Sequence, residues 1–147
     1  MNRIERMLYP ESIAIIGGGI WCENVIDQCQ KIGFEGHIWP VHPTRPKIKG
    51  VPCFLSVEAL PNGPDASFIG VNRFATIKVI QSLNKIGAQG AVCFASGFSE
   101  AISEDAQSAD LQDQLLIAAG EMAVLGPNCY GFINYLEGSL LWPDQHG

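Results

Sequence analysis

The sequence has no long apolar run, no closely spaced pair of cysteines and no excess of basic residues. No apolar stretch approaches the roughly 18 to 20 residues that a membrane-spanning helix needs. The first eight residues, Met1 to Leu8, do not form the apolar core of a secretion signal. We therefore expect a cytoplasmic protein with no membrane partner.

The five cysteines are scattered along the chain without a CxxC pair. Their spacing fits no zinc-ligand pattern, so no metal site is predicted, and reduced thiols are expected. Cys22 stands at the start of a predicted helix, where the helix dipole lowers the pKa of a thiol. Packing of a small buried side chain explains the same residue equally well.

Basic residues are outnumbered, with 9 lysines and arginines against 15 acidic residues and a net charge of −6. No basic stripe with interleaved aromatic residues is present, so nucleic acid is not an expected partner. An anionic ligand therefore needs a local binding site. Apolar residues make up 47% of the 147 residues, which is sufficient for the core of one domain over residues 1–147.

What the sequence does have is an apolar run that ends in three glycines. Residues 12–16 read Ser-Ile-Ala-Ile-Ile and are followed by Gly17, Gly18 and Gly19, and the apolar run at residues 91–95 ends similarly. Where a buried strand breaks into glycine before a helix, the backbone can approach a phosphate, and the helix offers unpaired N–H groups. The pattern predicts a phosphate-binding turn, with a tight turn that binds nothing as the alternative.

Strands and helices alternate along the chain. Strands are expected at residues 12–17, 37–42, 66–72, 90–95 and 122–125, and helices at 22–32, 56–60, 74–86 and 106–119. The alternation predicts an α/β fold, a single-domain, Rossmann-like, doubly wound parallel sheet in three layers. The expected strand order is 3-2-1-4-5, with the ligand crevice at the carboxyl ends of the first and fourth strands.

Two further expectations concern particular segments. Pro40 weakens the strand at residues 37–42 as a central strand of the sheet, and it favours a position near that strand's end. No regular element is predicted after about residue 131, and we expect the chain to be the N-terminal piece of a longer protein.

The glycine turn departs from the dinucleotide-binding fingerprint G-x-G-x-x-G. Gly17 and Gly19 match its first two glycines, but Cys22 stands where the third belongs. No acidic residue follows the second strand, where NAD enzymes hold the ribose hydroxyl. Both departures disfavour NAD.

Basic residues follow the second strand instead, at Arg45, Lys47 and Lys49. Cations at this place in a nucleotide-binding sheet suit a phosphate on the adenosine ribose. Coenzyme A and NADP both carry such a phosphate, and a solvated loop that binds nothing is the alternative.

Several short motifs together resemble the CoA-binding domain of NDP-forming acyl-CoA synthetases. They follow the family order over residues 7–135: LYPESIAIIG at 8–17, GFEGHIWPVHP at 33–43, Leu60-Pro61, Pro64-Asp65, GFSE at 97–100 and GPNCYG at 126–131. The same domain opens some bacterial protein acetyltransferases, and the α subunit of succinyl-CoA synthetase carries a relative. Each motif is weak by itself, but their combination is specific.

The resemblance implies a Rossmann-like fold that binds coenzyme A, and it implies a role for each matching segment. The pyrophosphate would lie on Gly17, Gly18 and Gly19. The adenosine would be flanked by Val41, His42 and Pro43, with Lys49 near the ribose phosphate. The crevice beside the first strand would be lined by Val71 and Asn72. The pantetheine arm would face Ser96, Gly97, Phe98, Ser99 and Glu100.

Three residues have two interpretations each. Trp21 follows the glycines where the family has a longer loop of small residues, and it either stacks on a ligand or blocks the phosphate site. After the third strand the family usually has Val-Pro, and this chain has Val71-Asn72-Arg73. Arg73 adds a phosphate contact or lies on the surface at a helix start. Asn128 either bonds a ligand or holds the turn formed by Gly126 and Pro127.

No catalytic residue is predicted. In the synthetases the phosphorylated histidine lies in a following domain, and His37, His42 and His146 do not match it. Ser99 has no adjacent histidine and aspartate to activate it. The parent protein is expected to be an acid–thiol ligase, with this chain alone not catalytic.

The expected partners are CoA or acyl-CoA and further domains or a β-type subunit, with a homo-oligomer as a further option. An NADP-binding module is the first alternative function. A degenerate assembly or regulatory domain, with Trp21 filling the space over Gly18, is the second.

Overall fold

The computed structural model describes residues 1–95, 106–126, 129, 131–134 and 138–143. Its helices are α1 (Arg3–Leu8), α2 (Ile20–Ile32), α3 (Arg73–Lys85), α4 (Ala106–Ala119) and the short 3₁₀ helix η1 (Val57–Ala59). Its strands are β1 (Ser12–Ile16), β2 (His37–Val41), β3 (Lys47–Ile48), β4 (Val51–Pro52), β5 (Ala66–Ile69), β6 (Gly90–Cys93), β7 (Ala123–Leu125), β8 (Phe132–Asn134) and β9 (Ser139–Leu141).

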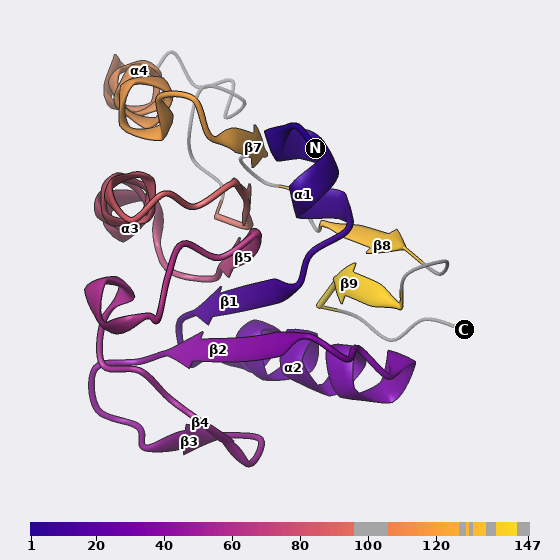
Figure 1. The fold of residues 1–147 in the computed structure, drawn as a ribbon. Coiled ribbons are helices and arrows are strands. Elements are labelled where there is room, and N and C mark those ends of the chain that lie inside the picture. Colours follow the sequence, from indigo (N-terminus) through magenta and orange to yellow (C-terminus); the bar gives the residue numbers. More distant parts are fainter. Residues whose placement is uncertain (96–105, 127–128, 130, 135–137, 144–147) are drawn as a thin grey trace.

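Five parallel strands form the central sheet, which is covered on both faces (Figure 1). Helices α3 and α4 lie on one face, and α1, α2 and the β8–β9 hairpin lie on the other. Each face has its own cluster of buried apolar side chains. The expected three-layer, Rossmann-like α/β fold is therefore confirmed. Among the described segments, no helix combines the length and the apolar character that a bilayer span requires.

The expected strand order was wrong. The sheet runs β2-β1-β5-β6-β7, so the third main strand lies beside the first and not beyond the second. Pro40 explains the difference, because it lies within β2 opposite Ile15 and has no N–H to donate to a second neighbour. A proline-bearing strand belongs at a sheet edge. The point where the strand order reverses, and with it the crevice, therefore lies between β1 and β5.

Helix α2 begins two residues earlier than expected. Gly19 is its N-cap, and Ile20 and Trp21 form its first turn instead of a loop. The helix ends at Gly33, whose φ of 81° lets its N–H reach the carbonyls of the last turn. The early start brings the N-terminus of α2 directly against the end of β1.

Short elements were missed by the sequence analysis. Helix α1 starts with a capping box between Asn2 and Glu5. Strands β3 and β4 form a hairpin whose two loop residues, Lys49 and Gly50, both have positive φ, at 51° and 78°, as a type I′ turn requires. The expected helix at 56–60 is the shorter η1, and Ser56 makes no side-chain cap bond.

The expectation of no regular element after residue 131 was also wrong, because β8 and β9 pair as an antiparallel hairpin. The hairpin packs on α2. The Asn134 amide and the Ser139 hydroxyl both donate to the Leu8 carbonyl, at 2.9 and 3.3 Å. These bonds fasten the hairpin to the end of α1.

Candidate functional site

The site is built where β1 and β5 end side by side. The N–H of Gly17 donates to the Val41 carbonyl of β2 at 3.2 Å, and the N–H of Gly70 donates to the Ile16 carbonyl at 2.9 Å. Sheet pairing therefore continues one residue past β1 and β5. The two turns that follow are held next to each other, and each leads into the N-terminus of a helix.

The three glycines after β1 have three different environments. Gly17 is buried and has a φ of +124°, and a Cβ there would lie 2.8 Å from the Gly70 carbonyl oxygen. A Cβ on Gly18 would meet the ring of His42 at 2.5 Å. Gly19 is exposed, and a Cβ there would meet no atom within 4 Å. Open space for a ligand thus begins at Gly19.

The N-terminus of α2 has no side-chain cap, because its N-cap residue is Gly19. The first N–H groups of a helix have no partner within it and carry a partial positive charge. Uncapped N–H groups beside open space are suited to binding a phosphate. The turn thus has the local geometry that a bound phosphate would require.

Cys22 fills the space that a third glycine would leave. Its side chain is fully buried, and its Sγ lies 3.0 and 2.5 Å from the Cβ positions of Gly17 and Gly70. The thiol lies 3.5 Å from the Ile16 carbonyl oxygen, to which it donates. Burial raises the pKa of Cys22 to about 12 and outweighs the backbone N–H groups that lower it. The hypothesis of a lowered pKa was wrong, and packing accounts for this residue.

Thiol labelling of the folded chain should follow this pattern. Burial raises the pKa of Cys22 and of Cys93 to about 12, so their thiolate fraction at pH 8 is about 10⁻⁴. We expect iodoacetamide at pH 8 to leave both unmodified in the folded chain and to modify both in denaturant, as peptide mass mapping would show. Labelling of Cys22 at the rate of the unfolded chain would contradict the packing. Half-buried Cys53 and Cys129 provide the internal comparison.

His42 organises the segment that follows β2. Its Nδ1 accepts hydrogen bonds from the backbone N–H groups of Thr44 at 3.1 Å and Arg45 at 3.0 Å. The Nδ1 edge of the ring thus faces these backbone N–H groups, and the other edge lies against Gly18. His42 thus joins the glycine turn to the basic segment. Val41 is buried at the end of β2, and Pro43 is exposed.

Two of the three basic side chains lie against α2. Arg45 donates from Nη1 to the Gly18 carbonyl at 2.9 Å and to Glu23 Oε1 at 3.2 Å. Lys49 Nζ lies 3.2 Å from Asp27 Oδ2. Lys47 is exposed on β3. The structure thus brings Arg45 to the glycine turn, but it also gives Arg45 and Lys49 acidic partners.

In the turn after β5, the predicted site residues make contacts within the protein. The Asn72 side chain caps α3 by accepting the Ala75 N–H at 2.9 Å. The Arg73 guanidinium lies over the ring of Phe74, 5.0 Å from its centroid. Val71 packs against the apolar cluster on the α3 face. The N-termini of α2 and α3 thus both lie at this edge of the sheet, and that of α3 is capped.

Trp21 does not fill the space over Gly18. Its indole packs on Phe94 with ring centroids 5.4 Å apart, and Phe94 in turn packs on Phe68 at 5.6 Å. The indole remains 39% exposed. The groups nearest the Cβ position of Gly18 are His42 and Arg45. The structure therefore does not support the alternative in which Trp21 fills the space over Gly18.

The remaining predicted residues lie outside the described residues; they are Ser96, Gly97, Phe98, Ser99, Glu100 and Asn128. Two contributors to the site were missed, Glu23 and Gly70. An acidic residue in the first turn of α2, opposite a basic segment, was the available signal for Glu23. Gly70 carried no such signal, because its importance depends on β5 lying beside β1. Among the residues with described placement, no three histidines, cysteines or carboxylates gather as metal ligands.

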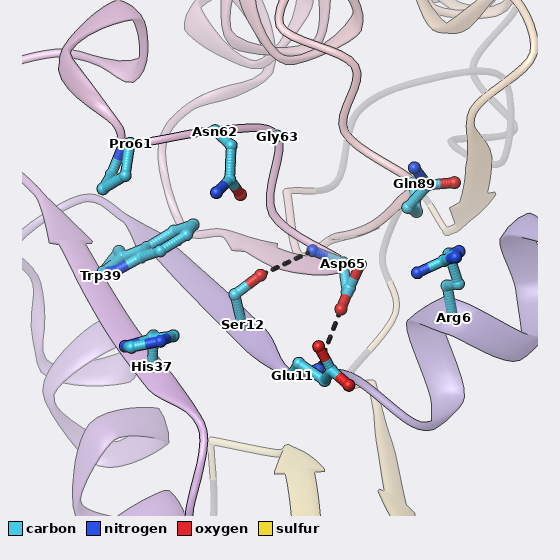
Figure 2. A pocket seen from close by; sticks show the side chains of 10 residues that line it. All are labelled: Arg6, Glu11, Ser12, His37, Trp39, Pro61, Asn62, Gly63, Asp65 and Gln89. Atoms are coloured by element: carbon cyan, nitrogen blue, oxygen red, sulfur yellow. Dashed lines mark hydrogen bonds between the residues drawn. The ribbon is translucent and has the colours of Figure 1, made fainter.

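A hollow of about 530 Å³ lies at the amino ends of the strands, opposite the glycine turn (Figure 2). It is lined by residues at the amino ends of the strands, including Ser12, His37 and Asp65. Asp65 accepts the Glu11 N–H at 2.9 Å and donates its own N–H to Ser12 Oγ at 3.1 Å, which fastens the start of β5 to the start of β1. Open α/β sheets bind ligands at the carboxyl ends of their strands, so we place the site at the glycine turn.

Known proteins are similar to this chain in sequence and in fold. Residues 11–135 match the family described as the CoA binding domain. The trans-feruloyl-CoA synthase FCS1 of an unknown prokaryotic organism is 32% identical over 92% of this chain and 20% of its own length. The ADP-forming acetate–CoA ligase I of Archaeoglobus fulgidus is 33% identical over 89% of this chain and 19% of its own length.

A solved structure is similar to this chain in fold. The dinucleotide-forming acetyl-coenzyme A synthetase 1 of Ca. Korarchaeum cryptofilum, in complex with phosphate and ADP, matches with a TM-score of 0.86 and 28% identity. The match covers 97% of this chain and 31% of that chain. The chain thus spans about one-fifth of the length of the curated relatives it matches.

Proposed function

This chain belongs to the CoA-binding domain family found in NDP-forming acyl-CoA synthetases, and from this premise we propose that it holds coenzyme A for a thioester formed together with further domains. The observation that carries the proposal is the N-terminus of α2, where uncapped N–H groups, open space at Gly19 and the Arg45 guanidinium lie together. Each of these features favours a bound phosphate.

We assign the parts of coenzyme A to residues as follows. The pyrophosphate lies at Gly18, Gly19 and the N-terminus of α2, beside Arg45. The adenosine lies along the end of β2, with its ribose phosphate toward Lys49. The pantetheine arm is proposed to face Ser96 to Glu100, as the family resemblance implies. These groups bind and orient coenzyme A and supply no acid, base or nucleophile.

The complete reaction belongs to a larger protein. Each curated relative named above is about five times as long as the matching region. We propose that domains beyond this chain, or a β-type subunit, activate the acyl group, and that the parent protein is a cytoplasmic acid–thiol ligase. The chain alone then binds coenzyme A without turnover.

Calorimetric titration of the 147-residue chain with CoA, dephospho-CoA and NADP tests the assignment. We expect CoA to bind, and removal of the 3′-phosphate to weaken binding about tenfold, which is the loss of one charge-assisted contact. NADP should bind more weakly than CoA. Absence of heat with CoA, while circular dichroism shows a folded chain, would refute the proposal. Tighter binding of NADP would favour the dinucleotide module instead.

The substitution Lys49→Asn tests which residue recognises the ribose phosphate. Asparagine tolerates the positive φ of this turn position, so the change removes the charge without straining the hairpin. CoA and dephospho-CoA should then bind this variant equally well. Lys85→Gln, at the end of α3, removes the same charge elsewhere and should leave the difference intact.

A further inference from the structure

Two acidic side chains of α2 face the basic segment. Glu23 and Asp27 are four residues apart, and therefore on one side of the helix. Glu23 contacts Arg45 and Asp27 contacts Lys49, each at 3.2 Å. All four side chains are partly exposed, so solvent weakens each pair but does not abolish it. The segment assigned to the nucleotide phosphates thus already has anionic partners.

Glu23 is the one that lies at the phosphate-binding turn. It is the fourth residue of α2, and a helical side chain points back toward the helix N-terminus. Its carboxylate meets Arg45 Nη1, the same atom that donates to the Gly18 carbonyl. A negative charge therefore lies next to the uncapped N–H groups and shares the guanidinium assigned to the pyrophosphate.

We propose that the Glu23 carboxylate is an internal competitor of the ligand's phosphate at the N-terminus of α2. The inference rests on the proposed function, since it concerns the same turn. A bound phosphate must share Arg45 with the carboxylate or displace it. Glu23 therefore lowers the affinity for the coenzyme, so bound coenzyme is released more readily than the turn alone would allow.

The alternative is that Glu23 assists binding by holding Arg45 in place. The geometry argues against it, because Arg45 also donates to the Gly18 carbonyl at 2.9 Å, a contact that does not involve Glu23. Glutamine at this position retains an amide oxygen that accepts from Arg45. The change Glu23→Gln therefore removes the charge while preserving the hydrogen bond.

The test is calorimetric titration of the wild-type chain and of Glu23→Gln with CoA. We expect the variant to bind about fivefold more tightly, the effect of removing one partly screened charge a few ångströms from a phosphate. The double variant Glu23→Gln/Arg45→Gln should lose this gain. A partly exposed ion pair contributes little to folding, and circular dichroism would verify that each variant is folded.

Glu121→Gln is the matched control. Glu121 also pairs with an arginine, Arg3 at 3.7 Å, but it precedes β7 and so lies at the opposite edge of the sheet. The Glu121→Gln variant should bind CoA as the wild type does. An equal gain in this variant would overturn the inference, because it would show that the net charge of the chain determines the affinity. Unchanged or weaker binding by Glu23→Gln overturns it while the proposed function stands. If neither wild type nor Glu23→Gln binds CoA, both proposals fail.

Discussion

Replacing Gly17 by alanine should lower the free energy of unfolding by about 3 to 5 kcal/mol, the sum of backbone strain and overpacking. The φ of +124° at Gly17 is one that L-residues rarely adopt, and the added Cβ would lie 2.8 Å from the backbone oxygen of Gly70. The Gly70 oxygen cannot move away from Gly17 independently, because the N–H of Gly70 is bonded to the Ile16 carbonyl at the end of β1. Since domains of this size have stabilities of about 5 to 15 kcal/mol, much of the total would be lost.

Urea denaturation followed by circular dichroism measures this loss, and Gly19→Ala is its control. Gly19 has a φ of −76° and open space around it, so alanine there should cost less than about 1 kcal/mol. Equal losses at the two positions would show that the conformation of Gly17 does not restrict the turn. A destabilised but folded Gly17 variant should keep the m-value of the wild type.

Replacing Gly70 by alanine should cost about 2 to 3 kcal/mol, at the upper end of overpacking effects in cores. The obstacle here is a side chain, because the added Cβ would lie 2.5 Å from Cys22 Sγ. The second substitution Cys22→Ala removes that sulfur. We therefore expect the double variant Gly70→Ala/Cys22→Ala to be more stable than Gly70→Ala alone.

A double-mutant cycle separates this relief from a general effect of losing the thiol. Cys22→Ala by itself should destabilise the chain by about 1 kcal/mol, because it leaves a small cavity. In the Gly70→Ala background the same change should be neutral or stabilising. Strictly additive losses would contradict the contact. Cys22→Ala should not rescue Gly17→Ala to the same extent, since a backbone oxygen blocks that position.

The fold class followed from the sequence because the alternation of apolar runs and helical spans is a local property. The strand order did not, because it depends on which strand can accept two neighbours. Pro40 carried that information, because it weakens its strand as a central strand. The expected order nevertheless placed that strand between two neighbours. The β8–β9 hairpin was missed because its strands have only three residues each, too few to show an alternating pattern.

At the site, the glycine turn was predictable because glycine has distinctive backbone chemistry. The different environments of the three glycines were not predictable, because they depend on tertiary contacts. Gly17 lies against Gly70 after β5, Gly18 lies against His42, and Gly19 faces open space. The basic segment was predicted as a phosphate-binding loop, but its pairing with Glu23 was not. That pairing depends on α2 starting immediately after Gly19, two residues before the periodicity suggested.

The attachment of the β8–β9 hairpin to α1 has a consequence for synthesis on the ribosome. The fully buried Leu141 belongs to the same apolar cluster as Met7, so this cluster is complete only after the β8–β9 hairpin has emerged. Until residue 141 leaves the exit tunnel, the sheet face beside α2 is only partly covered, and a nascent chain with exposed apolar surface is prone to aggregate. Ribosome-bound chains stalled before the hairpin should therefore bind a holdase chaperone, and chains stalled well beyond it should not.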